Sequence, residues 1–188
     1  VSGALFTPSA GMVDPFSACI APLENAIQNG VDVLLETEFT GFIKQGKKFV
    51  GVRSSQGDFD CRWVINAAGI YSDEIMHMAG EHPEFKISPR RGEYYILDKT
   101  EIEMNNILFP VPTKTSKGIL VLGSTHGNVV VGPNSEDSLD KENPSVTAPG
   151  LLEIWQGSQK LIPSLSPKSI IAVFAGLRAT GNAVCKNP

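Results

Sequence analysis

The stretch Trp63-Val64-Ile65-Asn66-Ala67-Ala68-Gly69, followed by Tyr71-Ser72-Asp73-Glu74-Ile75, decides the fold. An apolar run that breaks on small residues into a helical pattern predicts a buried strand, a turn and a helix, and α/β proteins bind cofactors at such corners. Ser72 is a suitable N-cap for this helix and Gly80 a suitable stop. The two alanines and the glycine would let a flat or charged ligand approach the backbone closely. The alternative is a tightly packed corner without a ligand.

The composition is that of a globular protein of 188 residues, enough for one large domain or two small ones. A formal net charge of −4, with no block of Lys or Arg, argues against a nucleic-acid partner. The longest apolar runs are too short to cross a bilayer and no signal-peptide pattern is present, so we expect a cytoplasmic protein. Cys19, Cys61 and Cys185 lack CxxC spacing, which argues against disulfides and against a metal site.

The first half of the chain predicts helices and strands in a layered α/β order. Asp14 before Pro15 starts a helix, whose apolar residues recur at helical spacing until Asn29-Gly30 stops it. A buried strand, a β-hairpin with a possible third strand, and the stretch quoted above follow, which suits an α/β domain with an inserted β-ribbon. The strands expected before that stretch cover residues 31–35, 39–44, 49–54 and 58–61.

The second half predicts a different architecture, because its apolar runs are short and strand-like. A helix over residues 151–161 has apolar residues spaced to bury one face, and residues 170–177 return as a central strand that ends at Arg178. These features predict an antiparallel sheet with a helix on one face, and a boundary between the two parts near residues 81–88. Gly132-Pro133-Asn134 is expected to stop the second strand of a wide hairpin. The short strands are expected over residues 93–97, 107–109, 118–122 and 129–131.

Six motifs follow one another along the chain: Gly11-Met12-Val13-Asp14-Pro15, Val64-Ile65-Asn66-Ala67-Ala68-Gly69, Pro89-Arg90-Arg91-Gly92-Glu93-Tyr94, Phe109-Pro110-Val111-Pro112-Thr113-Lys114, Gly127-Asn128 to Gly132-Pro133-Asn134, and Ala175-Gly176-Leu177-Arg178. Together they resemble the FAD-dependent oxidoreductases of the D-amino-acid oxidase superfamily. They look most like its branch of bacterial glycerol-3-phosphate dehydrogenases and L-2-hydroxyglutarate dehydrogenases. The resemblance covers nearly the whole chain in the right order, and the joint occurrence of the motifs is specific.

The resemblance implies a partial FAD-binding α/β domain over residues 1–85, with the β-ribbon inserted in it. A substrate-binding domain over residues 86–188 would carry a mixed, mainly antiparallel sheet covered by helices. In this family the substrate carbon delivers a hydride to flavin N5 while positive side chains hold a carboxylate or phosphate. The expected function is therefore oxidation of a small anionic substrate, first glycerol 3-phosphate, with L-2-hydroxyglutarate or a related 2-hydroxy acid as the alternative. Such an enzyme would be cytoplasmic or peripheral to the inner face of the membrane.

The resemblance implies four residues at the substrate site. Arg178 follows the strand end where the family holds the anion, and a guanidinium leaving an apolar strand needs a partner, either a ligand or an internal carboxylate. Arg91 corresponds to a family position near substrate or flavin. Tyr94 and Tyr95 point to opposite faces if they lie on a strand, so we name Tyr94 alone, although both could be ordinary sheet aromatics. Histidine titrates near neutrality, so His126 is a candidate general base, with a solvated turn residue as the alternative.

The resemblance also implies contacts to the flavin. In the family, the strand backbone after a pair such as Thr37-Glu38 contacts the adenine, which points to Phe39; valine is usual there, but only backbone atoms are needed. Ala67, Ala68 and Gly69 match the family turn near the dinucleotide, where a larger side chain would collide. His77 and His82 are expected to be surface residues.

Two features of the family are missing from these residues. The chain contains no GxGxxG loop with an acidic residue about 20 positions later, the elements that hold pyrophosphate and ribose. The glycine-rich segment that follows the substrate arginine is also missing. We therefore expect an internal piece of a longer enzyme that binds FAD weakly or not at all and is inactive by itself. A non-catalytic module that binds an anion or a protein is the alternative, and the flanking coding sequence would discriminate the two.

Overall fold

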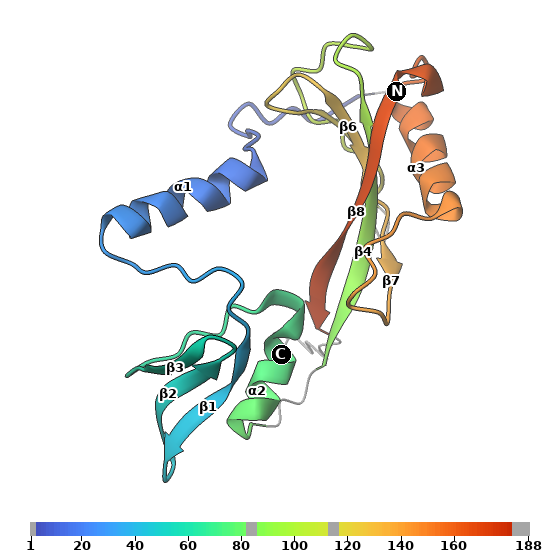
Figure 1. The fold of residues 1–188 in the computed structure, drawn as a ribbon. Coiled ribbons are helices and arrows are strands. Elements are labelled where there is room, and N and C mark those ends of the chain that lie inside the picture. The colour runs from blue at the N-terminus through green and yellow to red at the C-terminus, as the bar shows by residue number, and fades with distance from the viewer. Residues whose placement is uncertain (1–2, 82–85, 113–116, 182–188) are drawn as a thin grey trace.

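The computed structural model describes residues 3–81, 86–112 and 117–181, which form two antiparallel sheets and several helices (Figure 1). The expectations for His82, Cys185 and the Thr113-Lys114 end of one motif lie outside these residues. The helices are α1 (Pro15–Gln28), α2 (Ser72–Ala79) and α3 (Ala148–Leu161), with short 3-10 turns η1 (Gly69–Tyr71) and η2 (Pro167–Ser169). The strands are β1 (Phe39–Gln45), β2 (Lys48–Ser54), β3 (Gly57–Asp60), β4 (Ile87–Leu97), β5 (Leu120–Gly123), β6 (Val129–Gly132), β7 (Glu136–Asp137) and β8 (Ile170–Gly181).

Helix α1 begins and ends where the sequence predicts. The Asp14 side chain accepts a hydrogen bond from the backbone N–H of Phe16 at 3.1 Å, and Pro15 occupies the first helical position. Asn29 closes the helix, and Gly30 follows it with a φ of +88°. None of the residues of α1 is buried, so its apolar side chains face solvent in the described part of the chain.

The predicted ribbon forms a three-stranded sheet in the order β1-β2-β3. β1 and β2 pair antiparallel, and β3 adds on the far side of β2, which confirms the hairpin and its third strand. Phenylalanine rings at positions 39, 42 and 49 pack on one another with centroids 4.9 and 4.8 Å apart. The Lys44 ammonium donates to the carbonyl of Ala79 at 2.6 Å, so a cation on the ribbon satisfies the last turn of α2.

The two strands predicted to be buried in this half are wrong. Residues 31–35 and 63–68 are extended, but neither segment pairs with another strand of the described chain, and Trp63 and Ile65 are 88% and 89% exposed. An apolar run becomes a strand only when a neighbour takes up its backbone hydrogen bonds. α2 differs in a smaller way, because its N-cap is Tyr71 and Ser72 is its first residue. Gly80 stops α2 with a φ of +89°, as predicted.

The second sheet has the order β5-β6-β4-β7, with β8 on the other side of β4. β4 and β8 pair antiparallel along their whole length, from Ile87 opposite Gly181 to Leu97 opposite Ile170. β8 was predicted to be central, but in the described residues it is an edge strand and β4 takes the centre. Residues 107–109 form a single bridge from Leu108 to Val121 in place of the expected strand.

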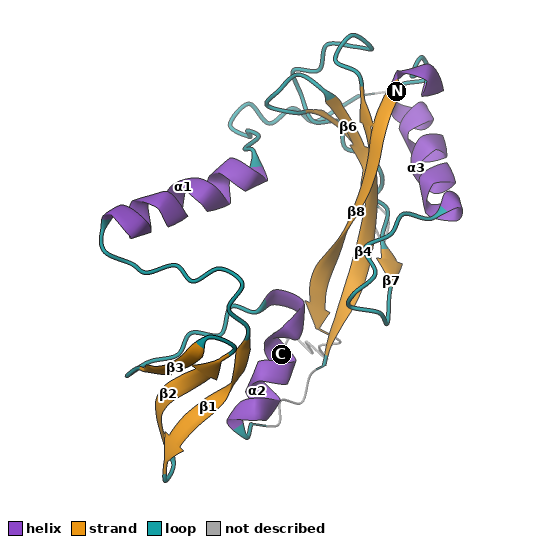
Figure 2. Cartoon of the chain, viewed as in Figure 1, coloured by secondary structure: helices purple, strands orange, loops and turns teal. Residues whose placement is uncertain are grey.

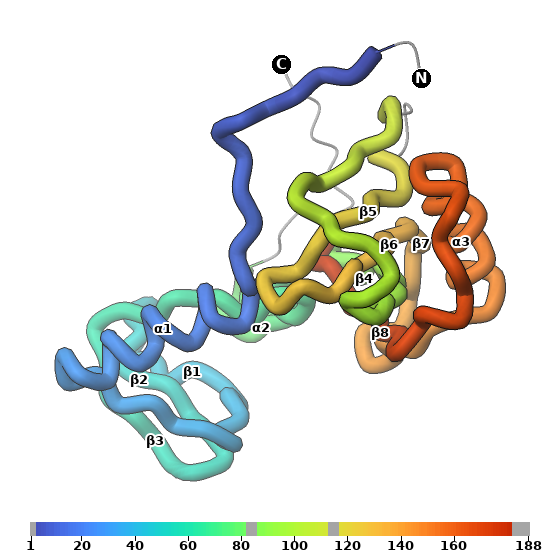
Figure 3. The backbone as a smooth tube through the Cα atoms, turned by 90° about the horizontal axis from the view of Figure 1, so that it is seen from above, coloured from blue at the N-terminus to red at the C-terminus, as the bar shows by residue number. Residues whose placement is uncertain are grey.

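The core lies between this sheet and α3. Leu97, Val121, Val129, Val131 and Ile154 of α3 are all fully buried there. α3 therefore covers one face of the sheet, while the other face looks toward α1 (Figures 2 and 3). No helix in the described residues is long and apolar enough to span a bilayer.

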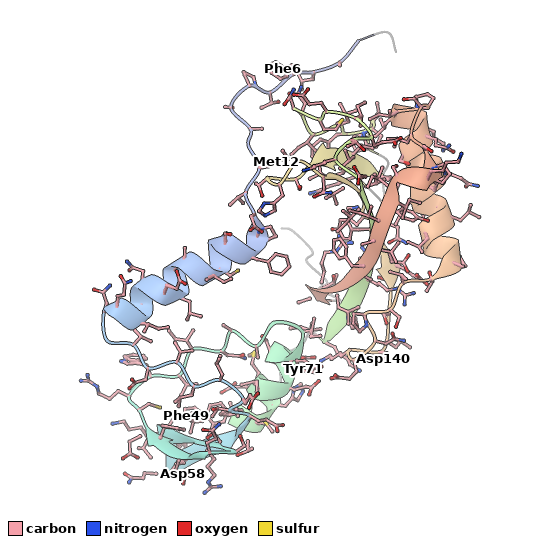
Figure 4. The ribbon with its side chains drawn as sticks, turned by 45° about the horizontal axis from the view of Figure 1, so that its top comes forward. Phe6, Met12, Phe49, Asp58, Tyr71 and Asp140 are labelled. Atoms are coloured by element: carbon pink, nitrogen blue, oxygen red, sulfur yellow. The ribbon has the colours of Figure 1, made fainter. Side chains whose placement is uncertain are left out.

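A cluster of charged groups joins the two parts of the molecule. Asp73 of α2 is 3% exposed and accepts hydrogen bonds from the Ile87 N–H at 2.9 Å and the Lys141 ammonium at 3.1 Å. The same ammonium lies 5.3 Å from the ring centroid of Tyr71, whose hydroxyl donates to Glu142. Figure 4 shows Tyr71 and Asp140 on these facing segments. The loop after β7 is thereby fixed against η1 and α2.

Candidate functional site

β4 and β8 present different side chains on their two faces, because successive residues of a strand alternate. On the α3 face, Tyr95 packs edge-on against Trp155, with centroids 5.7 Å apart. On the open face, Tyr94 stacks on Phe174 at 4.7 Å, which confirms that the two tyrosines point in opposite directions. Cross-strand partners share a face, so the open face carries the pairs Arg90 with Arg178, Gly92 with Gly176 and Tyr94 with Phe174.

Arg178 lies on the open face without a carboxylate partner. Its Nη2 donates to the Asn134 carbonyl at 3.1 Å, and the guanidinium lies over Gly92, where an added Cβ would come within 3.0 Å of Nη2. Arg90, its cross-strand partner, pairs with Asp137 at 2.7 Å, whereas no ion pair of the described residues involves Arg178. A guanidinium has five N–H donors, so Arg178 keeps donors for an external anion.

Arg91 lies on the opposite face and its charge is matched within the protein. Its Nη2 pairs with Glu136 at 2.7 Å, its Nε lies 3.6 Å from the Glu93 carboxylate, and Nη1 donates to the Ser145 carbonyl at 3.3 Å. The hydrogen bond to Glu136 is the main cause that raises the pKa of Arg91. The structure therefore does not bring Arg91 together with Arg178.

Tyr94 lies on the same face of the sheet as Arg178. Burial raises the pKa of the Tyr94 hydroxyl, and the nearby charge of Arg178 opposes that rise without cancelling it. The hydroxyl is therefore protonated at neutral pH and can donate or accept a hydrogen bond. The ring is held by its stack on Phe174, so the strand pair presents a cation and a fixed phenol on one face.

His126 lies at the other end of the sheet. Its side chain is 79% exposed on the β5–β6 turn, and its Nε2 is 4.0 Å from an oxygen of Asp14. That turn joins the sheet beside Leu97, seven residues along β4 from Arg90, the partner of Arg178, which is roughly 23 Å at a strand's rise per residue. One small substrate cannot reach both Arg178 and His126 in this geometry. His77 is exposed in α2, as expected.

The bend at Ala67, Ala68 and Gly69 is open rather than packed. All three residues are exposed, and Gly69 has a φ of +57° with no atom within 4 Å of the position its Cβ would take. Asn66 fixes the bend, because its side chain accepts from Ala68 N–H at 3.3 Å and donates to the Ser72 carbonyl at 2.8 Å. η1, which begins at Gly69, contacts both β4 and β8. The bend therefore adjoins the sheet that carries Arg178.

Phe39 stands apart from these groups. It is the first residue of β1 and pairs with Ser54, and its ring packs against Phe42. The Phe39 side chain thus packs within the ribbon. The expected contact to the adenine involves only backbone atoms of Phe39 and stays a prediction.

The residue that the sequence reasoning missed is Asn134. The sequence places it at the end of a strand and names no role for it in the site, yet it is 3% exposed and its carbonyl accepts from Arg178. Glu93, a charged residue in a strand, is fully buried beside it. The available signal was that Glu93 and Asn134 each stand in one of the six motifs that carry the family resemblance.

Comparison with known proteins decides the family. The sequence profile described as FAD dependent oxidoreductase matches residues 1–188. The chain belongs to this family. Among its relatives, a glycerol 3-phosphate dehydrogenase of Caloramator mitchellensis is 37% identical over 95% of this chain, which covers 37% of that protein. An L-2-hydroxyglutarate dehydrogenase of Salmonella houtenae is 26% identical over 98% of this chain, which covers 44% of that protein.

A solved structure of an FAD-dependent oxidoreductase supports the fold as well. L-alpha-glycerophosphate oxidase from Mycoplasma pneumoniae, with FAD bound, superposes with a TM-score of 0.77 at 31% identity. The match covers 89% of this chain and 44% of the oxidase. The chain thus spans less than half the length of each of these three relatives.

Proposed function

We propose that the chain is part of a flavin-dependent dehydrogenase that oxidises glycerol 3-phosphate, and that Arg178 binds the substrate's phosphate. The observation that carries this proposal is the guanidinium of Arg178, which has no carboxylate partner among the described residues and lies on the sheet next to an open bend. An anion is the ligand that satisfies such a group best. Relatives named for glycerol 3-phosphate support the choice of anion.

The bend is suited to hold the cofactor of the family. Ala67, Ala68 and Gly69 are exposed and carry no bulk, so a flat ring system can lie against their backbone, and Phe39 offers backbone groups for the adenine. When bound, FAD supplies the acceptor for the hydride of the substrate's carbinol carbon. Because residues 1–188 contain no GxGxxG loop, we expect these residues by themselves to bind FAD weakly and to be inactive.

The chain's own side chains divide the remaining work. Arg178 binds the phosphate through paired N–H donors, and the neutral hydroxyl of Tyr94 donates a hydrogen bond to a substrate oxygen. The stacked pair of Tyr94 and Phe174 excludes water from one side of the substrate. We assign no substrate contact to Arg91, whose charge is matched on the α3 face, or to His126, which lies too far away.

We further propose that the two parts correspond to two domains, a cofactor-binding part over residues 1–85 and a substrate-binding part over residues 86–188. The three-stranded sheet falls in the first part and the five-stranded sheet in the second. In this division the bend and Arg178 come from different domains, so the reaction would take place at their junction.

L-2-Hydroxyglutarate is the second candidate substrate. A carboxylate presents two oxygens to a guanidinium with the same geometry that a phosphate offers, so Arg178 serves either compound. The relative from Salmonella houtenae, which carries that name, favours this candidate.

The test uses the full-length protein loaded with FAD, with reduction of an artificial dye as the assay. Arg178→Ala is expected to raise the KM for glycerol 3-phosphate about 10²-fold, because two charge-assisted hydrogen bonds are lost. Arg178→Lys keeps the charge, and its KM for glycerol 3-phosphate is expected to lie between those of Arg178→Ala and the wild type. Arg90→Ala is the matched control, because Arg90 faces the same way but pairs with Asp137.

Each outcome bears on a different part of the proposal. An unchanged KM in Arg178→Ala contradicts the role of Arg178. Turnover of L-2-hydroxyglutarate but not of glycerol 3-phosphate replaces the first substrate by the second. Activity on neither compound rejects both.

A further inference from the structure

Two buried polar side chains lie at the carbonyl that Arg178 contacts, that of Asn134 itself and that of its partner Glu93. Glu93 is completely buried and Asn134 is 3% exposed. The backbone N–H of Glu93 donates to Asn134 Oδ1 at 2.9 Å, and Asn134 Nδ2 donates back to Glu93 Oε2 at 2.7 Å. Because the two hydrogen bonds run in opposite directions, the amide of Asn134 is held in one orientation.

The Glu93 carboxylate is itself fixed from the side of α3. Its Oε1 accepts from the backbone N–H of Thr147, the N-cap of α3, at 2.6 Å. Gly150 lets the helix come this close, because an added Cβ there would lie 1.5 Å from Glu93 Oε2. The positive end of the helix dipole favours a carboxylate at this position. Glu93 thus connects the helix to the turn that carries Asn134.

This connection continues to the open face of the sheet. The Asn134 carbonyl accepts from Arg178 Nη2 at 3.1 Å, and the guanidinium lies against Gly92, where an added Cβ would come within 3.0 Å of both Arg178 Nη2 and Pro133 Cβ. We propose that Asn134 and Glu93 are positioning residues, which hold the Arg178 guanidinium in place for the anion of the substrate. The inference rests on the proposed function, because it requires that Arg178 binds that anion.

The expected effect follows from pre-organisation. A free arginine side chain samples many rotamers, and the substrate must restrict them when it binds. The Asn134 carbonyl restricts these rotamers in advance, because the two buried hydrogen bonds between Asn134 and Glu93 hold it in place. Loss of these two hydrogen bonds is therefore expected to weaken substrate binding and to leave the chemical step nearly unchanged, which raises KM more than it lowers kcat.

The test is a double-mutant cycle in the full-length, FAD-loaded protein with glycerol 3-phosphate. Glu93→Gln keeps the side-chain volume but places an amide N–H₂ against one of the two donors, Asn134 Nδ2 or the Thr147 N–H. Asn134→Ala removes both hydrogen bonds between Asn134 and Glu93. Each variant alone is expected to raise KM about tenfold, with kcat within about twofold of the wild type. In an Arg178→Ala background neither substitution is expected to raise KM further, because both act through Arg178.

Asn128→Ala is the matched control. Its amide also donates to a backbone carbonyl, that of Leu97 at 3.2 Å, but at the opposite end of β4. It is expected to leave KM unchanged in both backgrounds. Should Asn134→Ala fail to retain flavin, Glu93→Gln decides the result.

The contrary outcomes are distinct. If Arg178→Ala leaves KM unchanged, the proposed function fails and this inference fails with it. If Arg178→Ala raises KM while Glu93→Gln and Asn134→Ala have no effect, or have the same effect with and without Arg178, the buried pair serves only the fold and this inference alone is overturned.

Discussion

At the end of β4 and β8, three arginines of the same chemistry differ in what surrounds them. Arg90 and Arg91 pair with Asp137 and Glu136, which arrive from β7, whereas Arg178 rests on Gly92 and a carbonyl. The sequence indicates that Arg178 needs a partner but cannot separate it from Arg91, because strand register supplies the carboxylates. The alternation of Tyr94 and Tyr95 could be predicted, since it depends only on local geometry.

Gly92→Ala tests the close packing of the Arg178 guanidinium on Gly92. The new Cβ would lie 3.0 Å from Arg178 Nη2 and 3.0 Å from Pro133 Cβ, so the guanidinium must move by a few tenths of an ångström. We expect KM for the anionic substrate to rise about threefold to tenfold in steady-state assays, with little change in thermal stability. Gly41→Ala, in open space on β1, is the control. An equal KM in both variants contradicts this role of Gly92.

Among the elements, those specified by local signals match the prediction and those that need a distant partner do not. The ends of α1 and the stop of α2 depend on a cap or a glycine within a few residues, and they lie where the sequence places them. Residues 31–35 and 63–68 are apolar enough for strands, but no pattern in the sequence names the neighbour that a ladder requires. The edge position of β8 was missed for the same reason.

Gly150→Ala tests an element-level conflict in α3. Alanine is the better helix former by about 1 kcal/mol, so helix propensity predicts a gain in stability. The added Cβ would collide with the buried Glu93 carboxylate, so we expect a net loss of about 3 kcal/mol in the free energy of unfolding. Denaturant unfolding measures it, with the exposed Glu153→Ala of the same helix as control. A stabilised Gly150→Ala variant contradicts the packing described above.

For the whole molecule, the order of the two sheets along the chain could be predicted, because the strands of each have their own sequence pattern. How they meet could not, because the junction depends on a few polar groups that are far apart in the sequence. Asp73, Lys141 and the pair of Tyr71 with Glu142 lie there, and none of them belongs to the six motifs. At this junction η1, which begins at the bend, contacts β4 and β8, the strand that carries Arg178.

The junction predicts a dependence of stability on pH. Burial tends to raise the pKa of Asp73, but hydrogen bonds from Ile87 and Lys141 and the charge of Lys141 together hold it below the ordinary value of 3.8. A carboxyl with a depressed folded-state pKa adds stability above its unfolded pKa, and that stability is lost as pH falls through the folded pKa. Between pH 5 and 3, the melting temperature of the wild type is therefore expected to fall more steeply than that of Asp73→Asn.

The control for this comparison is Asp58→Asn, an exposed residue of β3 that lies far from the junction (Figure 4). It is expected to follow the wild type across the same range. Parallel melting curves for Asp73→Asn and the wild type contradict the role of Asp73 at the junction.

The burial of Glu93 between α3 and Asn134 also bears on how such an enzyme would be re-engineered. A library randomised only on the open face of the sheet would omit Thr147 and Gly150, which belong to α3 on the other face but lie against the Glu93 carboxylate that holds Asn134. Selection for a new acid substrate is therefore expected to enrich changes at the start of α3, and their benefit would vanish when the arginine is replaced.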